Sequence, residues 1–298
     1  MITVSGITKR YGRKTAVEDI TFDLASGRVT GFVGPNGAGK STTMRAMVGL
    51  TRPDRGEVRY HGALYRNLAD PARVVGSVLD ARCMHPGRTA RNHLRALAAA
   101  GRVPSQRVGA VLDEVGLGAV EGQRVGGFSL GMRQRLALAG ALLGEPQALL
   151  LDEPSNGLDP DGIRWLRNYL RSFADQGGTV LVSSHLIAEL SMFADDLVVV
   201  GAGKLIAADS MAAITSRHES TVLVETPRPG DLARALAALG LNVEIDGTRL
   251  RVQGTTKTLV SQVAYDNGIQ VLELSETVRS LEDSLIEMTM ASAEYVSA

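Results

Sequence analysis

The stretch from Gly34 to Ser41 reads GPNGAGKS, and it constrains the fold more than any other part of the sequence. It follows the short apolar run 31–33, which is typical of a strand, and precedes a helical pattern that ends near Gly49. The stretch matches G-x-x-x-x-G-K-[ST], in which glycines let backbone N–H groups wrap phosphates at the positive end of a helix. Because a strand precedes it and a helix follows it, a phosphate-binding loop is favoured over a chance glycine turn.

In such a loop Lys40 reaches the β- and γ-phosphates of a nucleotide, and the Ser41 hydroxyl is a ligand of Mg²⁺. The sequence therefore predicts ATP and Mg²⁺ as cofactors. The residues predicted to contact them are Gly34, Asn36, Gly37, Ala38, Gly39, Lys40, Ser41 and Thr42.

A second apolar run, Ala148–Leu151, is followed at once by Asp152 and Glu153. Two acids at the end of a buried strand are costly unless a cation or hydrogen bonds compensate them. Beside a phosphate-binding loop, this pattern predicts Asp152 as a metal ligand and Glu153 as the residue next to the attacking water. The alternative, an ordinary strand end with solvated acids, would be reasonable only for the run in isolation.

Apolar runs alternate with helical patterns over the first two thirds of the chain, which predicts an α/β fold with a largely parallel central sheet. The segments Met1–Ile7, Val17–Leu24 and Glu57–Tyr60 instead predict a small antiparallel sheet beside it. From Asp80 to about Glu145 the pattern is mostly helical and predicts a helical lobe. The apolar anchors expected there are Leu94, Leu97, Leu112 and Val115.

The pattern breaks near residues 215–220, so we expect one domain over 1–218, with its helical lobe at about 80–145, and an accessory domain over 220–298. The order β-α-β-β-α-β predicts a ferredoxin-like α+β fold for the second domain. Apolar residues are expected on a first helix (Leu232, Leu236 and Leu239), on a strand (Val243 and Ile245) and on a second helix (Leu259 and Val263). A last strand is expected at Val271–Leu274, followed by a final helix with Leu281, Leu285 and Met288 on one face.

Composition narrows the choice of partners and compartment. The chain has 32 basic and 32 acidic residues, so no global field favours nucleic acid, and no nucleic-acid partner is expected. Its single cysteine, Cys83, cannot form an internal disulfide, which fits a reducing compartment. We see neither a signal peptide nor a membrane span in the sequence, and therefore expect any action at a membrane to occur through docking.

The segment Phe128–Arg135 reads FSLGMRQR and resembles the signature of the ABC ATPase family, usually LSGGQ. Ser129 and Gly131 occupy matching places, whereas Leu130 replaces the first glycine and Met132 replaces the glutamine. Ser129 is expected to open a helix, so that its hydroxyl and the helix N-terminus face a γ-phosphate. In isolation a capped helix without a ligand would be the simpler interpretation, but the segment stands just before the Ala148 strand.

The resemblance to ABC ATPases extends over roughly residues 1–215. It implies that Tyr11 stacks on adenine, that Asp159 in the D-loop (residues 155–159, SNGLD) contacts nucleotide, and that His185 lies near the γ-phosphate as a catalytic residue with Glu153 and Lys40. A half-buried strand tyrosine remains the alternative for Tyr11.

The family usually has a glutamine where Asp80 stands, at a position that touches Mg²⁺ and connects to the membrane partner. Asp80 is shorter and negatively charged; it is still expected as a ligand of the metal, although its charge would repel the γ-phosphate. Either coupling differs here, or the register is shifted.

The same resemblance implies a head-to-tail dimer in which each ATP lies between the phosphate-binding loop of one copy and the signature of the other. It further implies an ATPase subunit that drives a separate transmembrane permease, most resembling bacterial exporters of antibiotics, peptides or lipids. The expected location is the cytoplasmic face of the membrane. The alternatives are a soluble ABC ATPase acting on nucleic acid or the ribosome, which usually has two such domains or a long coiled-coil insertion, and a non-hydrolysing ATP sensor, which Glu153 argues against.

Overall fold

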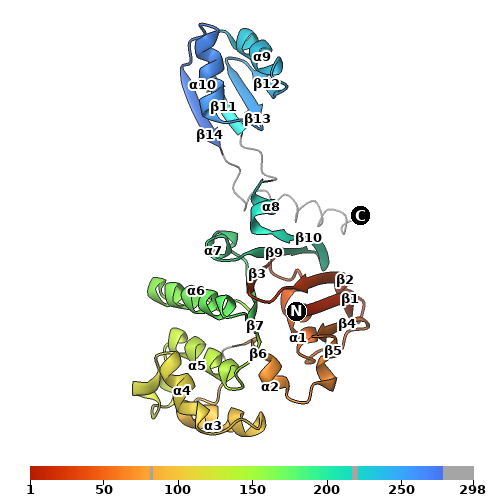
Figure 1. Cartoon of the computed structure of the whole chain (residues 1–298), viewed down its shortest axis with the longest axis vertical. Helices are drawn as coiled ribbons and strands as arrows, with labels where there is room; N and C mark the ends of the chain where they lie inside the picture. The colour runs from red at the N-terminus through yellow and green to blue at the C-terminus, as the bar shows by residue number, and fades with distance from the viewer. Residues whose placement is uncertain (81–82, 217–220, 278–298) are drawn as a thin grey trace. The chain divides into compact units, whose positions relative to one another are not determined.

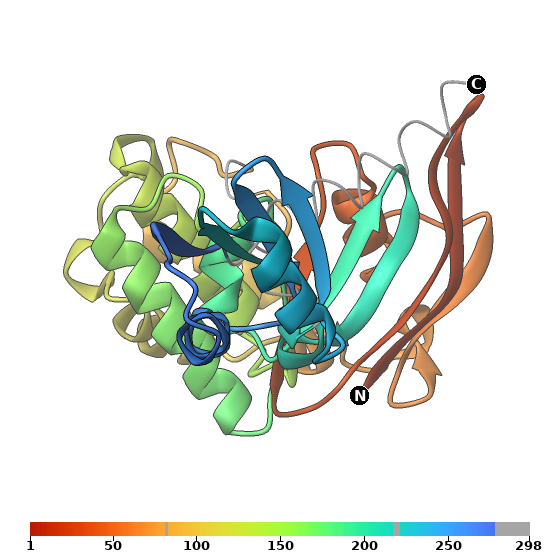
Figure 2. The same ribbon diagram turned by 90° about the horizontal axis from the view of Figure 1, so that it is seen from above.

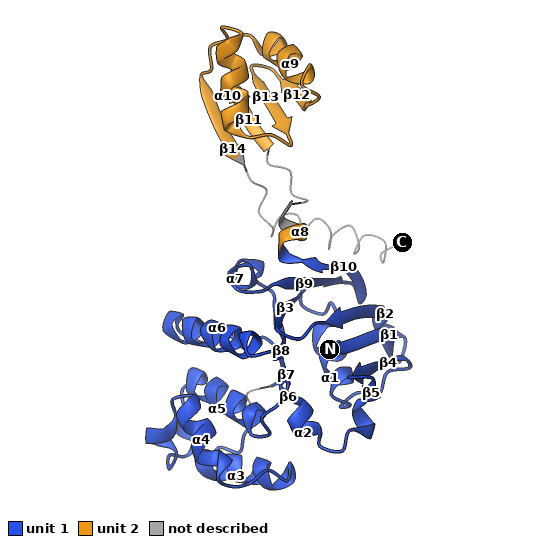
Figure 3. Ribbon diagram, viewed as in Figure 1, with its two compact units in different colours: residues 1–211, 288–298 blue, residues 212–287 orange. Residues whose placement is uncertain are grey.

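The chain folds into two compact units, coloured separately in Figure 3. The computed structural model describes residues 1–80, 83–216 and 221–277. The described part of the first unit is Met1–Met211, and the second unit begins at Ala212. Within these described ranges, no helix combines the length and the apolar character that crossing a bilayer requires.

The first unit is built on a six-stranded sheet whose strands alternate along the chain with helices (Figure 1). Five neighbouring strands are parallel, and the sixth, β10, pairs antiparallel with β9. The expected α/β fold with a largely parallel sheet is therefore confirmed. In sheet order the strands are β10 (Lys204–Ser210), β9 (Asp196–Gly201), β3 (Arg28–Val33), β8 (Thr179–Ser184), β7 (Ala148–Leu151) and β6 (Val75–Val78).

An antiparallel sheet flanks this core, as the N-terminal pattern predicts. Its two long strands, β1 and β2, run side by side in Figure 2 and pair from Ile2–Leu24 to Tyr11–Lys14. Helix α1 (Lys40–Met47) shares one buried apolar cluster with both sheets. In this cluster Met44 of the helix is fully buried and Phe22 of β2 is almost fully buried. In sheet order the strands are β2 (Lys14–Leu24), β1 (Ile2–Tyr11), β4 (Arg55–Tyr60) and β5 (Ala63–Leu64).

The segment between β6 and β7 is helical, as expected. Its helices are α3 (Ala90–Ala100), α4 (Arg107–Glu114) and α5 (Leu130–Leu142), with short 3-10 turns η2 (Gly118–Val120) and η3 (Val125–Gly127). Leu94, Leu112 and Val115 are fully buried, but the prediction that Leu97 is a core anchor is wrong. Leu97 is 41% exposed, because α3 turns Leu94 and Ala98 toward its neighbours and leaves Leu97 at the edge of a cleft.

The remaining helices of the first unit complete its layers. The apolar face of α6 (Pro160–Asp175) packs on β3 and β8, on the side of the central sheet opposite α1 (Figure 1). Pro160 occupies its first turn, where a missing N–H costs nothing. The short elements are η1 (Tyr65–Asn67), α2 (Pro71–Val74) and α7 (Ile187–Ser191); α8 (Met211–Ser216) follows β10.

The described elements of the second unit follow the order β-α-β-β-α-β. They are β11 (Thr221–Glu225), α9 (Pro229–Ala237), β12 (Asn242–Asp246), β13 (Arg249–Gln253), α10 (Lys257–Asp266) and β14 (Glu273–Thr277). All pairings in their sheet are antiparallel, and the strand order is β12-β13-β11-β14. Both helices contribute to one apolar cluster with the sheet, centred on Val224, Leu236 and Val260.

Three of the apolar positions expected on the elements of this unit are exposed. Leu259 is 42% exposed, because α10 turns its neighbour Val260 into the core. Ile245 is 53% exposed on the edge strand β12, and Leu239 is 58% exposed beyond the end of α9. The last strand begins at Glu273, two residues later than expected. The predicted final helix, with Leu281, Leu285 and Met288, lies outside the described residues.

Candidate active site

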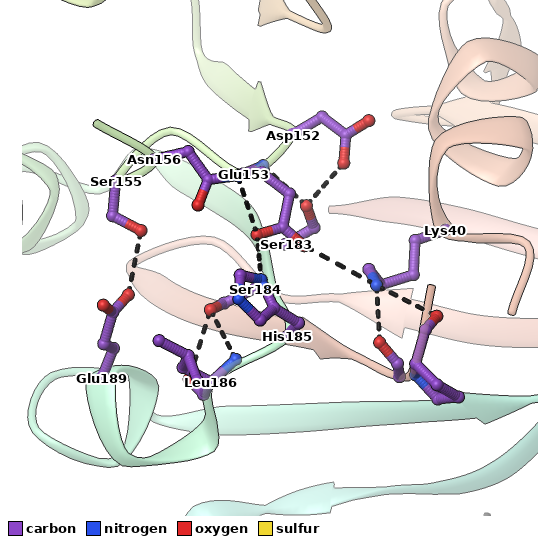
Figure 4. Close-up of polar contacts among 12 residues, drawn as sticks. Lys40, Asp152, Glu153, Ser155, Asn156, Ser183, Ser184, His185, Leu186 and Glu189 are labelled. Atoms are coloured by element: carbon purple, nitrogen blue, oxygen red, sulfur yellow. Dashed lines mark hydrogen bonds and ion pairs between the residues drawn. The ribbon is translucent and has the colours of Figure 1, made fainter. Parts of the chain in front are cut away.

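Side chains from three segments meet where the parallel strands of the central sheet end. The phosphate-binding loop follows β3, Asp152 and Glu153 follow β7, and His185 follows β8. These strands are neighbours in the sheet and run in the same direction, so their carboxyl ends share one edge. Sequence segments more than a hundred residues apart therefore form one cluster (Figure 4).

The loop needs glycine at two positions for reasons of space. A Cβ on Gly34 would lie 2.2 Å from the carbonyl oxygen of Val200. Gly39 has φ +102°, and a Cβ there would lie 2.7 Å from the carbonyl oxygen of Ala16. The loop is thus wedged against β9 and β2, which fixes it at the start of α1. Ala38 is buried, Asn36 and Gly37 are exposed, and Ser41 and Thr42 are partly exposed.

Lys40 is a buried cation with a carboxylate in reach. Its side chain is 6% exposed, and its ammonium group donates to the carbonyl oxygens of Gly34 (2.5 Å) and Pro35 (3.4 Å). The Nζ atom also lies 3.7 Å from Oε1 of Glu153. A buried charge is tolerated only with such compensation, so the loop holds a cation ready where phosphates would bind.

Ser183 connects the two acids. Its fully buried hydroxyl donates to Oδ1 of Asp152 (2.6 Å) and accepts a hydrogen bond from the backbone N–H of Glu153 (2.8 Å). The backbone N–H of Asp152 also donates to the carbonyl oxygen of Val78 on β6. The sequence suggested no role for Ser183; a hydroxyl near the end of the strand next to β7 is the signal that could have indicated one.

Glu153 lies between Lys40 and His185 in Figure 4. Nδ1 of His185 is 2.8 Å from Oε2 of Glu153, and the His185 side chain is 42% exposed. Glu153 itself has φ +49°, a left-handed conformation that is unfavourable for a residue with a side chain. Such strain persists only where the surroundings hold it, and it is common at functional sites.

The residues of the signature and D-loop cap the helices that follow them. Ser129 is the N-cap of α5, and its hydroxyl accepts from the N–H of Met132 (3.2 Å). Asp159 is the N-cap of α6, and its carboxylate accepts from the N–H of Gly162 (2.9 Å). Among the described residues, no hydrogen bond or ion pair joins Ser129, Gly131 or Asp159 to Lys40, Glu153 or His185. Within one chain these two groups of predicted site residues are not brought together.

Tyr11 and Asp80 stand at the ends of two strands, β1 and β6. Tyr11, the last residue of β1, is 51% exposed, and the Lys9 ammonium lies 5.5 Å from its ring centroid. An exposed ring fits a stacking surface better than it fits the alternative of a half-buried strand tyrosine. Asp80 follows the end of β6, is exposed, and lines a cleft of about 740 Å³ between the central sheet and the helical segment.

The donor set suits Mg²⁺. Asp152 supplies a carboxylate that Ser183 orients, and Ser41 supplies a hydroxyl at the start of α1. Mg²⁺ prefers such oxygen ligands and is usually held by one or two carboxylates together with substrate phosphates. Among the described residues, no three or more histidine, cysteine, aspartate or glutamate side chains are placed together to hold a metal.

The chain is similar to proteins of known family along its whole length. The family described as ABC transporter matches residues 17–156, and a domain family of unknown function matches residues 220–282. An uncharacterized ABC transporter ATP-binding protein of Bacillus subtilis (strain 168) is 32% identical over 299 residues, covering 99% of this chain and 98% of that protein.

Two further relatives have more specific names. A bacitracin transport ATP-binding protein of Bacillus licheniformis is 30% identical, covering 97% of each chain. A Nod factor export ATP-binding protein of Rhizobium leguminosarum bv. viciae is 32% identical, covering 97% of this chain and 94% of that protein. Among solved structures, an ATP-binding subunit of an ABC transporter superposes with a TM-score of 0.66 at 27% identity, covering 73% of this chain and 92% of that one.

Proposed function

The chain belongs to the ABC transporter ATP-binding family, and from this premise we propose that it hydrolyses ATP as the energy-coupling subunit of an exporter. ATP hydrolysis is the activity of the family, and the comparisons do not favour a soluble ATPase acting on nucleic acid or the ribosome. The observation that best supports a catalytic role here is the Glu153 carboxylate, which lies 3.7 Å from Lys40 Nζ and 2.8 Å from His185 Nδ1.

In this proposal the phosphate-binding loop holds the β- and γ-phosphates by its backbone N–H groups, and Lys40 turns its ammonium group toward them. Lys40 already lies beside Glu153, so the phosphates enter next to the residue that activates water. Glu153 accepts the proton of the attacking water, and His185 supports the γ-phosphate. Mg²⁺, held by Ser41 and Asp152, would neutralise charge that develops on the phosphates.

We further propose that two copies of the chain share each site. Ser129 caps α5 and Gly131 lies in its first turn, and within the described residues no hydrogen bond or ion pair joins them to Lys40 or Glu153 of their own chain. An N-terminal helix end with a serine cap is suited to an anion, so the signature would complete the site of a second copy. Tyr11 would stack on the adenine in each site, and Asp159 would add a contact from the D-loop.

The membrane partner would be a separate permease. The relatives include a bacitracin transport protein and a Nod factor export protein, which supports export as the direction. Asp80 stands where the family usually has the glutamine that connects to the partner, and it lines the cleft beside β6. We therefore place the permease contact at this cleft, and the chain at the cytoplasmic face of the membrane. Asp80 is also proposed as a further ligand of the metal.

Purification from membranes tests this assignment. The tagged full-length chain should co-purify with a protein that has about six apolar spans of about 20 residues each. Addition of that protein should change the rate of ATP hydrolysis. Purification of an active ATPase whose rate is unaffected by any co-purifying membrane protein would contradict the coupling role and leave the ATPase activity intact.

A further inference from the structure

The D-loop packs directly on the first residue of the signature helix. Gly157 has φ +77°, and a Cβ built on it would lie 1.9 Å from Cδ2 and 2.7 Å from Cγ of Leu130. Real Cβ atoms do not approach other carbons this closely. Because Cγ is also too close, turning Leu130 about χ2 alone would not relieve the contact; only a turn about χ1, which moves the side chain off Gly157, would do so. Residue 157 must be glycine as long as Leu130 keeps its place.

Leu130 is one of the positions where the signature departs from the family pattern, which has glycine there. Its side chain is 45% exposed, so it is not an ordinary core residue. A glycine at position 130 could not fill the space over Gly157. The departure at 130 and the glycine at 157 are therefore matched in shape.

Two other contacts hold the same pair of segments together. Nε2 of Gln134 on α5 donates to the carbonyl oxygen of Asn156 (3.4 Å). Cδ2 of Leu158 lies 3.3 Å from the place of a Cβ on Gly131. The start of α5 thus fits the D-loop at three successive residues, Asn156 to Leu158.

The opposite side of the D-loop reaches the candidate base. Nδ2 of Asn156 donates to Oε2 of Glu153 (3.5 Å), the same oxygen that faces His185. The N–H of Asn156 also donates to the carbonyl oxygen of Glu153 (3.2 Å), next to its left-handed backbone. Ser155 anchors the loop by donating to Oε2 of Glu189 on α7 (2.9 Å).

We propose that Leu130 is a positioning residue for Glu153 of the same chain and acts through Gly157 and Asn156. This inference rests on the proposed role of Glu153 as the base. When Leu130 is seated on Gly157, the Asn156 amide is held on the Glu153 carboxylate and fixes its orientation toward water. Displacing the loop turns the carboxylate away, and a misplacement of about 1 Å can cost about 100-fold in rate. ATP is expected to keep binding to the phosphate-binding loop of the same chain, because the hydrogen bonds of Asn156 within the described residues go to Glu153 and Gln134 and not to that loop.

A double-mutant cycle in the full-length protein tests this relation. The variants are Gly157→Ala, Leu130→Ala and the double variant, each measured for kcat and for ATP affinity. We expect Gly157→Ala to lower kcat about 10- to 100-fold and to change ATP affinity by less than about twofold. The double variant should return to within about threefold of Leu130→Ala, because the clash is gone.

Gly62→Ala is the matched control for backbone strain. Gly62 has φ +85°, and a Cβ there would meet nothing within 4 Å. This variant should keep wild-type kcat. A second check is the Asn156→Ala background, in which Gly157→Ala should reduce kcat by less than about twofold further, since the amide that transmits the displacement is absent.

The inference is overturned if Gly157→Ala leaves kcat unchanged, if the effects at 130 and 157 multiply independently, or if ATP affinity falls in parallel with kcat. Failure of the assignment of Glu153 as the base can be told apart from failure of the inference about Leu130. Near-normal turnover in Glu153→Gln would show that Glu153 is not the base, whatever the result of the double-mutant cycle.

Discussion

The two units of this chain differ in whether they bury a charged side chain. In the first unit the ammonium group of Lys40 is buried at the end of parallel strands, with Glu153 beside it. In the described part of the second unit, the buried polar side chains are the uncharged Thr226 and Thr255. Its ion pairs are at the surface, for example Arg249–Glu225 on the sheet (3.0 Å) and Arg234–Asp231 on α9 (2.6 Å).

Chemistry is expected where the charge is buried. Burying a charge is costly, and folding alone gives no reason to do so at the carboxyl end of a sheet. Surface ion pairs, by contrast, contribute little to stability and suit a sheet face that water covers. The second unit therefore has the features of a packed module, and we propose a regulatory or dimer-stabilising role for it, with packing alone as the alternative.

Glu153→Gln should have the largest effect of the substitutions considered. The change keeps the shape of the side chain and removes the base, so kcat should fall about 100- to 10,000-fold. ATP binding should persist, and closed dimers should accumulate with ATP. Single-turnover kinetics and size-exclusion chromatography in ATP would measure both. Turnover near that of the wild type would show that Glu153 is not the base.

Lys40→Ala should weaken ATP binding about 10- to 100-fold, because a charged hydrogen bond to phosphate contributes about 1.5–3 kcal/mol. Calorimetric titration with ATP is the measurement. The matched control is Lys204→Ala, because the Lys204 ammonium group pairs with Glu18 at the surface. This control should keep wild-type affinity; equal affinity in Lys40→Ala would contradict the phosphate-binding role.

Leu250→Ala should destabilise the second unit without changing nucleotide binding by the first. Leu250 is fully buried in the second unit, so its truncation should lower that unit's free energy of unfolding by about 2–5 kcal/mol. ATP affinity should not change. Thermal unfolding and calorimetric titration of the same sample would give both numbers. A parallel loss of ATP affinity would mean that the second unit contributes to the site.

Truncation near Ser220 should have the smallest effect on nucleotide binding. Every predicted nucleotide contact lies upstream of this residue, so ATP affinity should stay within about twofold. Dimerisation or permease-coupled turnover should change if the second unit is regulatory. Loss of ATP binding in a truncated protein that remains folded would show that the second unit is needed for nucleotide binding. Unchanged dimerisation and unchanged permease-coupled turnover would rule out the regulatory role and leave only a packing role.

Sequence patterns predicted the parts of the first unit where motif and periodicity agree. Ala148–Leu151 forms β7 with the expected bounds, and Lys40 begins α1 as expected. Periodicity alone was less reliable. Leu97 and Leu259 lie one helical position away from the buried rows, because apolar residues on both sides of a helix leave its rotation undetermined.

Contacts between distant segments could not be predicted. Ser183 holds Asp152 and Glu153 through two hydrogen bonds, and only the pairing of β7 with β8 brings them together. The seat of Leu130 on Gly157 likewise depends on how α5 meets the D-loop. In the sequence, Leu130 is visible only as a departure from the signature pattern.

Mixing two inactive variants shows whether each site is built from two copies of the chain. Ser129→Arg should block the signature of its chain, and Lys40→Ala should block the phosphate-binding loop of its chain, so each variant alone should hydrolyse little ATP. In a mixed dimer, one site joins the intact loop of the first variant to the intact signature of the second. An equal mixture should therefore recover about a quarter of the wild-type rate, since about half of the dimers are mixed and each has one intact site. A mixture no more active than the two variants measured apart would contradict the account.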